Sequence, residues 1–225
     1  MTRDQLHINF KIQMDKNSQS VAFGGCPAFL PEEIDYWLNL GLFTKVSNKF
    51  TGQNSLQQSF EKSVKRIHDL EKLVQTDTEL AATKEANTNR CYITNLFNDI
   101  RMFYVDAMLN FGNSKTPVLL VDHESAKRFK KSYNNNPWID TPIATIEDNT
   151  LYVYYDDVTM SSDTYTIDLT YVKVPTKIED LPTSGVDELP EYMWNEVVNK
   201  AVELALEDIE SKRLQTKSQL NQIDE

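Results

Sequence analysis

The spacing of apolar residues changes character twice along this chain, and this change limits the folds open to it. Near both ends apolar residues recur every three or four positions, which is the period of an amphipathic helix, whereas residues 90–174 are rich in β-branched and aromatic side chains. The expected fold class is therefore α+β. The N-terminal and C-terminal amphipathic helices are predicted to form a bundle, with an antiparallel β-sheet subdomain inserted between them.

Three helices are expected in the N-terminal part. The first follows Thr2, which can cap it, and the second opens at Pro31, a residue favoured in the first helical turn. The third is predicted over about 55–74. Their apolar stripes comprise Leu6, Phe10 and Met14; then Ile34, Trp37, Leu38, Leu42 and Val46; then Phe60, Val64, Ile67, Leu70, Leu73 and Val74.

The β-rich middle contains several separate signals. Residues 76–89 are polar and are predicted to be irregular, and PVLLV over 117–121 is predicted to be a buried strand. Residues 123–131 favour a short helix with Ala126 and Phe129 inward. A tight turn at Asp148-Asn149 would join two strands, and a further strand is expected over 165–174.

The C-terminal part consists of a connector and a long helix. Residues 175–190 hold three prolines and one glycine, and the helix is predicted from Pro190 to about residue 217. Its face comprises Trp194, Val197, Val198, Ala201, Val202, Ala205 and Ile209. Apolar residues become sparse after Leu206, so residues 214–225 are expected to contact a neighbouring subunit or a partner, with disorder as the alternative.

These signals predict four segments. They are an N-terminal helical part of the bundle over 1–75, a β-rich subdomain with its connector over 76–186, the long C-terminal helix completing the bundle over 187–217, and a tail over 218–225.

Charge and cysteine content narrow the classes of function. There are 23 Lys and Arg against 34 Asp and Glu, a formal net charge of -11. Such a surface repels phosphate and disfavours tight duplex binding, although it suits a conduit through which DNA slides. The two cysteines, Cys26 and Cys91, are expected to be free thiols in a reducing compartment. Without a signal peptide or an apolar stretch long enough for a bilayer, the protein is expected to be made in the cytoplasm with no membrane partner.

The most enzyme-like motif is Asp122-His123-Glu124, which follows the predicted strand over 117–121. Catalytic groups often lie at strand ends, so a small metal-dependent hydrolase using these three residues is one hypothesis. Asp122 or Ser125 could equally cap the next helix, whose positive end the acidic residues favour. No second His or Cys lies at the spacing of a metal ligand set.

Other candidate residues also have a structural explanation. Cys26, in a Gly-Gly-Cys-Pro turn, lacks a nearby base in the sequence, and Asp156, Asp157 and Asp163 do not match a calcium-binding loop. His68 is interpreted as a packed or surface residue. Lys62, Lys65 and Arg66 form a basic cluster that Glu61, Asp69 and Glu71 offset, which is typical of a solvated charged face. We therefore assign no catalytic, cofactor-binding or metal-binding residue and expect a protein that is not an enzyme.

The order of the segments resembles a known family. The helical pieces are PEEIDYWLNLGLFTKVSNKF, FEKSVKRIHDLEKLV and LPEYMWNEVVNKAVELALEDIESKR, and IEDNTLYVYYDD and IDLTYVKVP lie in the β-rich part. Together they resemble head–tail connector and tail tubular (ring) proteins of tailed bacteriophages, most nearly those of crAss-like short-tailed phages. The resemblance extends from about residue 2 to 213.

The resemblance implies a structural virion protein of the neck or tail, with no cofactor. Its partners would be further copies of itself in a dodecameric ring, a portal protein, and adjacent tail or ring proteins. Genomic DNA would be only the non-specific cargo of the channel, including during ejection. Another capsid-associated or tail-associated virion component stays open as an alternative.

Overall fold

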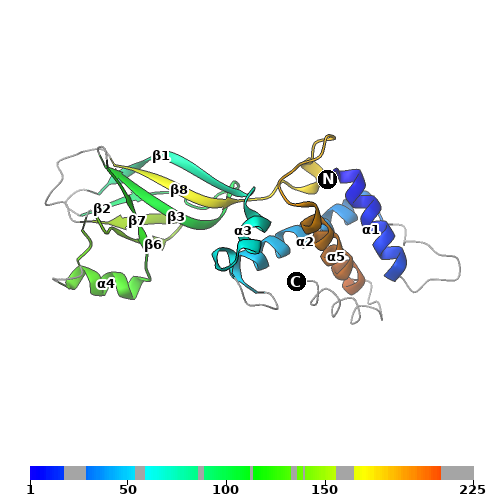
Figure 1. Cartoon of the computed structure of the whole chain (residues 1–225), viewed down its shortest axis with the longest axis horizontal. Coiled ribbons are helices and arrows are strands. Elements are labelled where there is room, and N and C mark those ends of the chain that lie inside the picture. The colour runs from blue at the N-terminus through cyan, green and yellow to red at the C-terminus, as the bar shows by residue number, and fades with distance from the viewer. Residues whose placement is uncertain are drawn as a thin grey trace. The chain divides into compact units, whose positions relative to one another are not determined.

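The computed structural model describes residues 1–17, 29–53, 59–85, 89–111, 114–132, 136–138, 140–155 and 165–208. The chain divides into two compact units, one made of Met1–Leu73 with the chain from Pro175 onward, and the other of Val74–Val174. As predicted, the fold is α+β (Figure 1). N-terminal helices pack with the C-terminal helix, and a mostly antiparallel, nearly closed, barrel-like sheet of eight strands is inserted between them in the chain.

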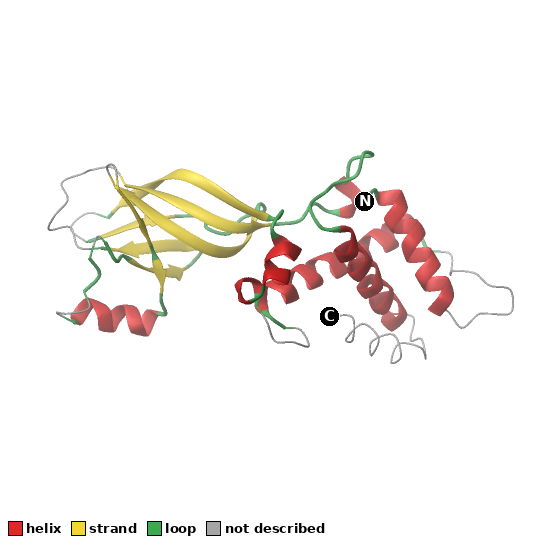
Figure 2. Ribbon diagram, in the orientation of Figure 1, coloured by secondary structure: helices red, strands yellow, loops and turns green. Residues whose placement is uncertain are grey.

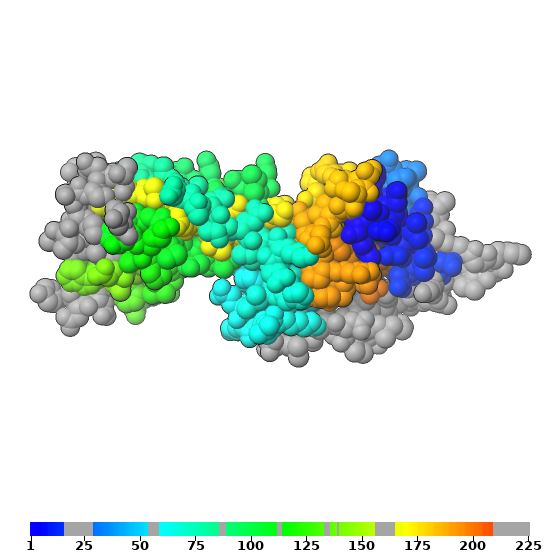
Figure 3. Space-filling model, turned by 45° about the horizontal axis from the view of Figure 1, so that its top comes forward, coloured from blue at the N-terminus to red at the C-terminus, as the bar shows by residue number. Residues whose placement is uncertain are grey.

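The helical unit begins with α1 (Arg3–Asn17), which Thr2 caps as predicted. The backbone amide of Gln5 donates to Thr2 Oγ1 at 3.3 Å, and Gln5 Oε1 accepts from the Thr2 amide at 3.0 Å. Leu6, Phe10 and Met14 are fully buried, whereas Ile8 and Ile12 on the other face are exposed. In Figure 3 the blue surface of α1 adjoins the orange surface of α5 (Glu191–Asp208), against which α1 packs.

The helix α2 (Pro31–Thr51) packs closely on α5 because of a glycine. A Cβ added to Gly41 would lie 2.9 Å from the carbonyl oxygen of Val197 and 3.1 Å from the amide nitrogen of Ala201. Any side chain at this position would therefore push the two helices apart. The predicted apolar stripes of α2 and α5 are confirmed as buried for all described members.

The predicted third helix is wrong in its extent, and its predicted buried face is only partly confirmed. The structure has a short 3-10 helix, η1 (Phe60–Lys62), followed by α3 (Val64–Leu70). Val64 is 83% exposed and Ile67 is also exposed, while Arg66 and Asp69 are buried instead. Phe60, Leu70 and Leu73 are buried as predicted, so the prediction fails at Val64 and Ile67, where the charged residues Arg66 and Asp69 are buried instead.

The inserted unit contains eight strands and one short helix among the described residues (Figure 2). The strand order is β4-β3-β8-β1-β2-β7-β6-β5. The strands are β1 (Val74–Lys84), β2 (Arg90–Ile93), β3 (Arg101–Phe111), β4 (Ser114–Pro117), β5 (Leu119–Leu120), β6 (Ile143–Glu147), β7 (Thr150–Tyr154) and β8 (Tyr165–Lys173). The first and last strands, β1 and β8, are antiparallel neighbours, with Val74 opposite Val172.

The strand β1 corrects the expectation of an irregular segment over 76–89. It pairs with β8 on one side and with β2 on the other, yet none of its side chains is fully buried. A register shift between Asp77 and Leu80 interrupts its alternation, and Glu79 there has a φ of 57°. A polar strand with a bulge lacks the regular apolar alternation that sequence analysis detects.

The segment 117–121 also differs from the prediction of one buried strand. Pro117 ends β4, which pairs with β3, and Leu119 begins β5, which pairs in parallel with β6 at the other edge of the sheet. The chain thus passes from one edge of the sheet to the other at Val118, which is buried. Leu119 is 62% exposed, and it lies at the seam between the two edge strands β4 and β5.

Two other local predictions are confirmed. The helix α4 covers His123–Lys131, and Asp148 and Asn149 both have positive φ in the turn between β6 and β7.

No helix in the described part of the chain has both the length and the apolar character needed to cross a bilayer. The end of the predicted long helix and the segment 214–225 lie outside the described residues.

Candidate functional site

Asp122, His123 and Glu124 lie at the start of α4 on the surface of the β unit. Asp122 caps the helix, since its Oδ1 accepts from the Ser125 amide at 2.7 Å, and this hydrogen bonding lowers the pKa of Asp122. Glu124 pairs with Arg128, and both of these side chains are about three-quarters exposed. His123 is exposed. The geometry thus gives Asp122 the capping role, and none of the three residues lines either of the two hollows described below.

The remaining predicted candidates do not converge either. Cys26 and the three aspartates Asp156, Asp157 and Asp163 lie outside the described residues. Cys91 is fully buried in the core of the β unit, and burial raises the pKa of its thiol to about 12. Across the segments that the structure describes, no three His, Cys, Asp or Glu side chains are grouped as a metal site.

His68 is a surface residue, and its Nδ1 lies 3.2 Å from Glu71 Oε1. Lys62 and Lys65 are exposed, in agreement with a solvated charged face. Arg66 and Asp69 do not belong to that face, because both are buried. The solvated-face interpretation is therefore wrong for these two residues.

Asp69 belongs to a buried charge cluster that joins α2, α3 and α5. Its Oδ2 lies 3.5 Å from Lys49 Nζ and 3.4 Å from Arg66 Nη1, and its Oδ1 accepts from the Tyr192 hydroxyl. Glu196 adds a second carboxylate, 2.8 Å from Lys49 Nζ. Burial and then the Asp69 hydrogen bond raise the pKa of Tyr192. The charges balance, and Lys49 and Asp69 each contact another helix, so the cluster fixes the packing of the helical unit.

A smaller polar cluster joins α1 to α2. Asp35 is buried and accepts hydrogen bonds from Arg3 and from His7, whose Nε2 lies 2.7 Å away. Burial alone would raise the pKa of Asp35, but the bonds from Arg3 and His7 outweigh it and lower the pKa. This cluster also positions helices, because both partners of Asp35 come from α1.

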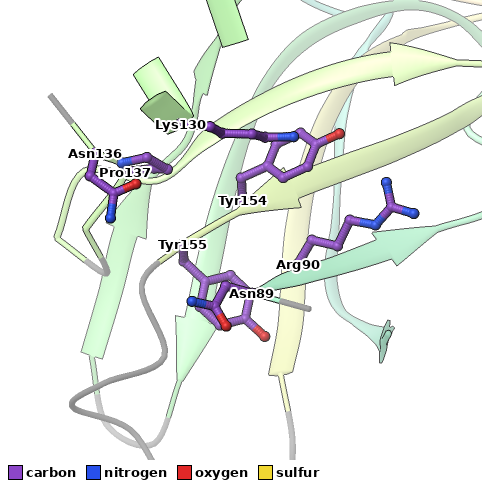
Figure 4. Close-up of a pocket in the computed structure, with 7 residues that line it drawn as sticks. All are labelled: Asn89, Arg90, Lys130, Asn136, Pro137, Tyr154 and Tyr155. Carbon is purple, nitrogen blue, oxygen red and sulfur yellow. The ribbon is translucent and has the colours of Figure 1, made fainter. Parts of the chain in front are cut away.

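Two hollows in the β unit are lined in part by residues of α4. A hollow of about 270 Å³ is lined by Asn89, Arg90, Lys130, Asn136, Pro137, Tyr154 and Tyr155. Figure 4 shows Lys130 reaching across the face of Tyr154, and its Nζ lies 3.2 Å from the ring centroid. Arg90 enters from β2 and forms an ion pair with Glu85. Burial would raise the pKa of Tyr154, but hydrogen bonds with Thr145, Arg90 and Lys130 lower it.

A second hollow, of about 650 Å³, adjoins the first at Asn136 and Pro137, which line both. Trp138, half-exposed, and Leu119 at the seam of the sheet give it an apolar wall. The other lining residues are Asp106, Pro117, Val118, Phe129, Asp140, Thr141, Pro142 and Ile143. Aspartates are thus the charged groups of this hollow, whereas the first hollow carries an arginine and a lysine.

The helix α4 carries four basic side chains, of which Lys130 lines the smaller hollow. Lys127, Arg128, Lys130 and Lys131 are all exposed, in a chain whose net charge is -11. Tryptophan, tyrosine and arginine are enriched among the residues that contribute most to protein interfaces, so this surface is a candidate binding surface. Sequence analysis missed it, although the run KRFKK was visible, because the hollows depend on contacts between distant segments.

No model of a known protein family matches this chain, and a search of curated proteins finds no match either.

Proposed function

We propose that this chain is a ring-forming structural subunit of a bacteriophage neck or tail, which links a portal protein to the tail around the DNA channel. The observation that carries the proposal is that each unit exposes large apolar side chains. Ile8, Ile12 and Tyr36 are exposed on the helical unit, and Leu119 and Trp138 on the β unit. Exposed apolar side chains on two separate units suit a protein that is buried by several neighbours at once.

Charge and sequence resemblance support the same proposal. A net charge of -11 lets duplex DNA pass without binding tightly. The segments quoted above resemble connector and tail tubular proteins, for which a dodecameric ring in the virion is the expected assembly. The partners would be further copies of this chain, the portal, and the next tail or ring protein.

The hydrolase hypothesis receives no comparable support. Asp122 is engaged as a helix cap, Glu124 pairs with Arg128, and the hollows beside α4 are lined by other residues. A different capsid-associated or tail-associated role would use the same kinds of surface, so location within a particle separates it from a neck ring.

Electron microscopy tests the proposal directly. The purified chain is mixed with a portal protein from the same genome, and the particles are imaged and their masses measured. We expect closed rings stacked on the portal. A chain that neither forms rings nor binds the portal would contradict the proposal, and a thermal shift with divalent ions together with hydrolytic activity would favour the hydrolase instead.

A further inference from the structure

We infer that the two hollows beside α4 receive the exposed face of α2 from a second copy of this chain. We call the exposed face of α2 the giving surface and the two hollows beside α4 the receiving surface. The contact would be head to tail, because the giving surface lies on the helical unit and the receiving surface on the β unit. This inference rests on the proposed ring function and names the surfaces through which neighbouring subunits would meet.

The receiving surface has two chemically different parts. The smaller hollow carries Lys130, and the larger has the apolar wall of Trp138 and Leu119. Since Asn136 and Pro137 line both hollows, one continuous segment of a partner can reach both. Such a segment needs a carboxylate beside bulky apolar side chains.

The outer face of α2 carries this combination. Glu32, Tyr36 and Leu40 are spaced four residues apart, which places them along one side of the helix. Glu32 is exposed, Tyr36 is 63% exposed and Leu40 is 40% exposed. The opposite face of α2 is buried within its own unit, so this side remains available to another molecule.

The spacing along α2 sets how far apart its three side chains lie. Four residues of helix advance about 6 Å, so Glu32 and Leu40 are about 12 Å apart along the helix axis. Glu32 would meet Lys130 in the smaller hollow, while Tyr36 and Leu40 would pack on Trp138 and its neighbours. Duplex DNA fits less well, because Asp106 and Asp140 line the adjoining hollow and would repel phosphates.

The two surfaces differ from each other, and this has a geometric consequence. A contact between unlike surfaces that is not made reciprocally within a two-fold pair leaves one surface of each kind free, so it propagates from subunit to subunit until rotation closes a ring. The inferred contact therefore provides the kind of interface that the proposed function requires.

A charge exchange tests the contact with two single variants. In Lys130→Glu the receiving surface becomes negative, and in Glu32→Lys the giving surface becomes positive. Each variant alone then places like charges at every contact. In an equal mixture the two variants can alternate, so that their substituted side chains face each other at one contact and the unchanged Lys130 and Glu32 face each other at the next. Lys65→Glu, at an exposed lysine on α3, is the matched control.

Self-association is measured by sedimentation velocity at low salt, with circular dichroism to confirm folding. We expect each single variant to associate about tenfold or more weakly than wild type, since close like charges oppose binding. The mixture should regain most of the association, which also shows that both variants fold. Lys65→Glu should associate as wild type does.

Several outcomes would overturn the inference. The wild-type protein could stay monomeric up to about 1 mM, each single variant could associate as strongly as wild type, or mixing the two variants could fail to restore association. Loss of binding to a double-stranded DNA fragment by Lys130→Glu, with association unchanged, would reassign the α4 surface to DNA. If rings still form on the portal in either case, the proposed function stands and only this contact is wrong.

Discussion

The buried charge cluster of the helical unit makes Asp69→Asn the most informative substitution for stability. The change keeps the size of the side chain and an oxygen that can accept from Tyr192, but it removes one negative charge. Lys49, Arg66 and Asp69 are each at most 2% exposed, so solvent cannot replace the lost charge. Breaking a buried ion pair from one side costs about 3–5 kcal/mol.

The expected loss lies near the lower end of that range, about 3 kcal/mol, because Glu196 still neutralises Lys49 at 2.8 Å. With a urea dependence of about 2 kcal/mol per molar, the unfolding midpoint should fall by about 1.5 M. Tryptophan fluorescence is a suitable probe, since two of the three tryptophans, Trp37 and Trp194, are buried in the helical unit.

Glu71→Gln is the matched control, as it removes a carboxylate near the end of the same helix. Its pairing with His68 is about half-exposed on both sides, and such surface pairs contribute about 0.5 kcal/mol or less. If Asp69→Asn lost less than about 1 kcal/mol, or no more than Glu71→Gln, the assignment of a packing role to the buried charges would be refuted.

Two further predictions concern α2. Gly41→Ala should lower the stability of the helical unit by about 1–2 kcal/mol in urea unfolding, because the overpacking against α5 exceeds the gain in helix propensity. Thr44→Ala should change the stability of the helical unit by less than about 0.5 kcal/mol. If the two substitutions had equal effects, the close approach of α2 to α5 would be contradicted. Asp35→Asn should be less stable than wild type near neutral pH. Because the pKa of Asp35 is lowered in the folded protein, its carboxylate stabilises the fold fully above the unfolded pKa of 3.8. This stabilisation is lost as the pH falls through the folded pKa. The free energies of unfolding of the two proteins, measured from neutral to acidic pH, should therefore converge below about pH 4. A difference between them that stays constant with pH would contradict this.

The sequence predicted those elements whose signals are local. The spacing of Leu6, Phe10 and Met14 fixed the buried face of α1, and Asp122 fixed the start of α4, because apolar period and capping act over a few residues. β1 escaped prediction because its longer pairing is with β8, far away in the chain, and its bulge at Glu79 breaks the alternation.

The candidate surface was harder to predict than the fold class. The basic run of α4 is visible in the sequence, but the hollows form only where the segment before β6 meets β2 and β7 on one side and β3 and β5 on the other. The buried pairing of Lys49 with Asp69 likewise joins residues of two helices. Both features depend on long-range packing, which periodicity within a single segment does not encode.

The pairing of β1 with β8 has a consequence for how such proteins can diversify. The chain leaves the helical unit after Leu73 and returns at Pro175, and the strands that begin and end the excursion are antiparallel neighbours at Val74 and Val172. Residues opposite each other in such a ladder lie about 5 Å apart. A tight turn could therefore span the same two points, so recombination could exchange the whole β unit for a different insert while the helices keep their connections.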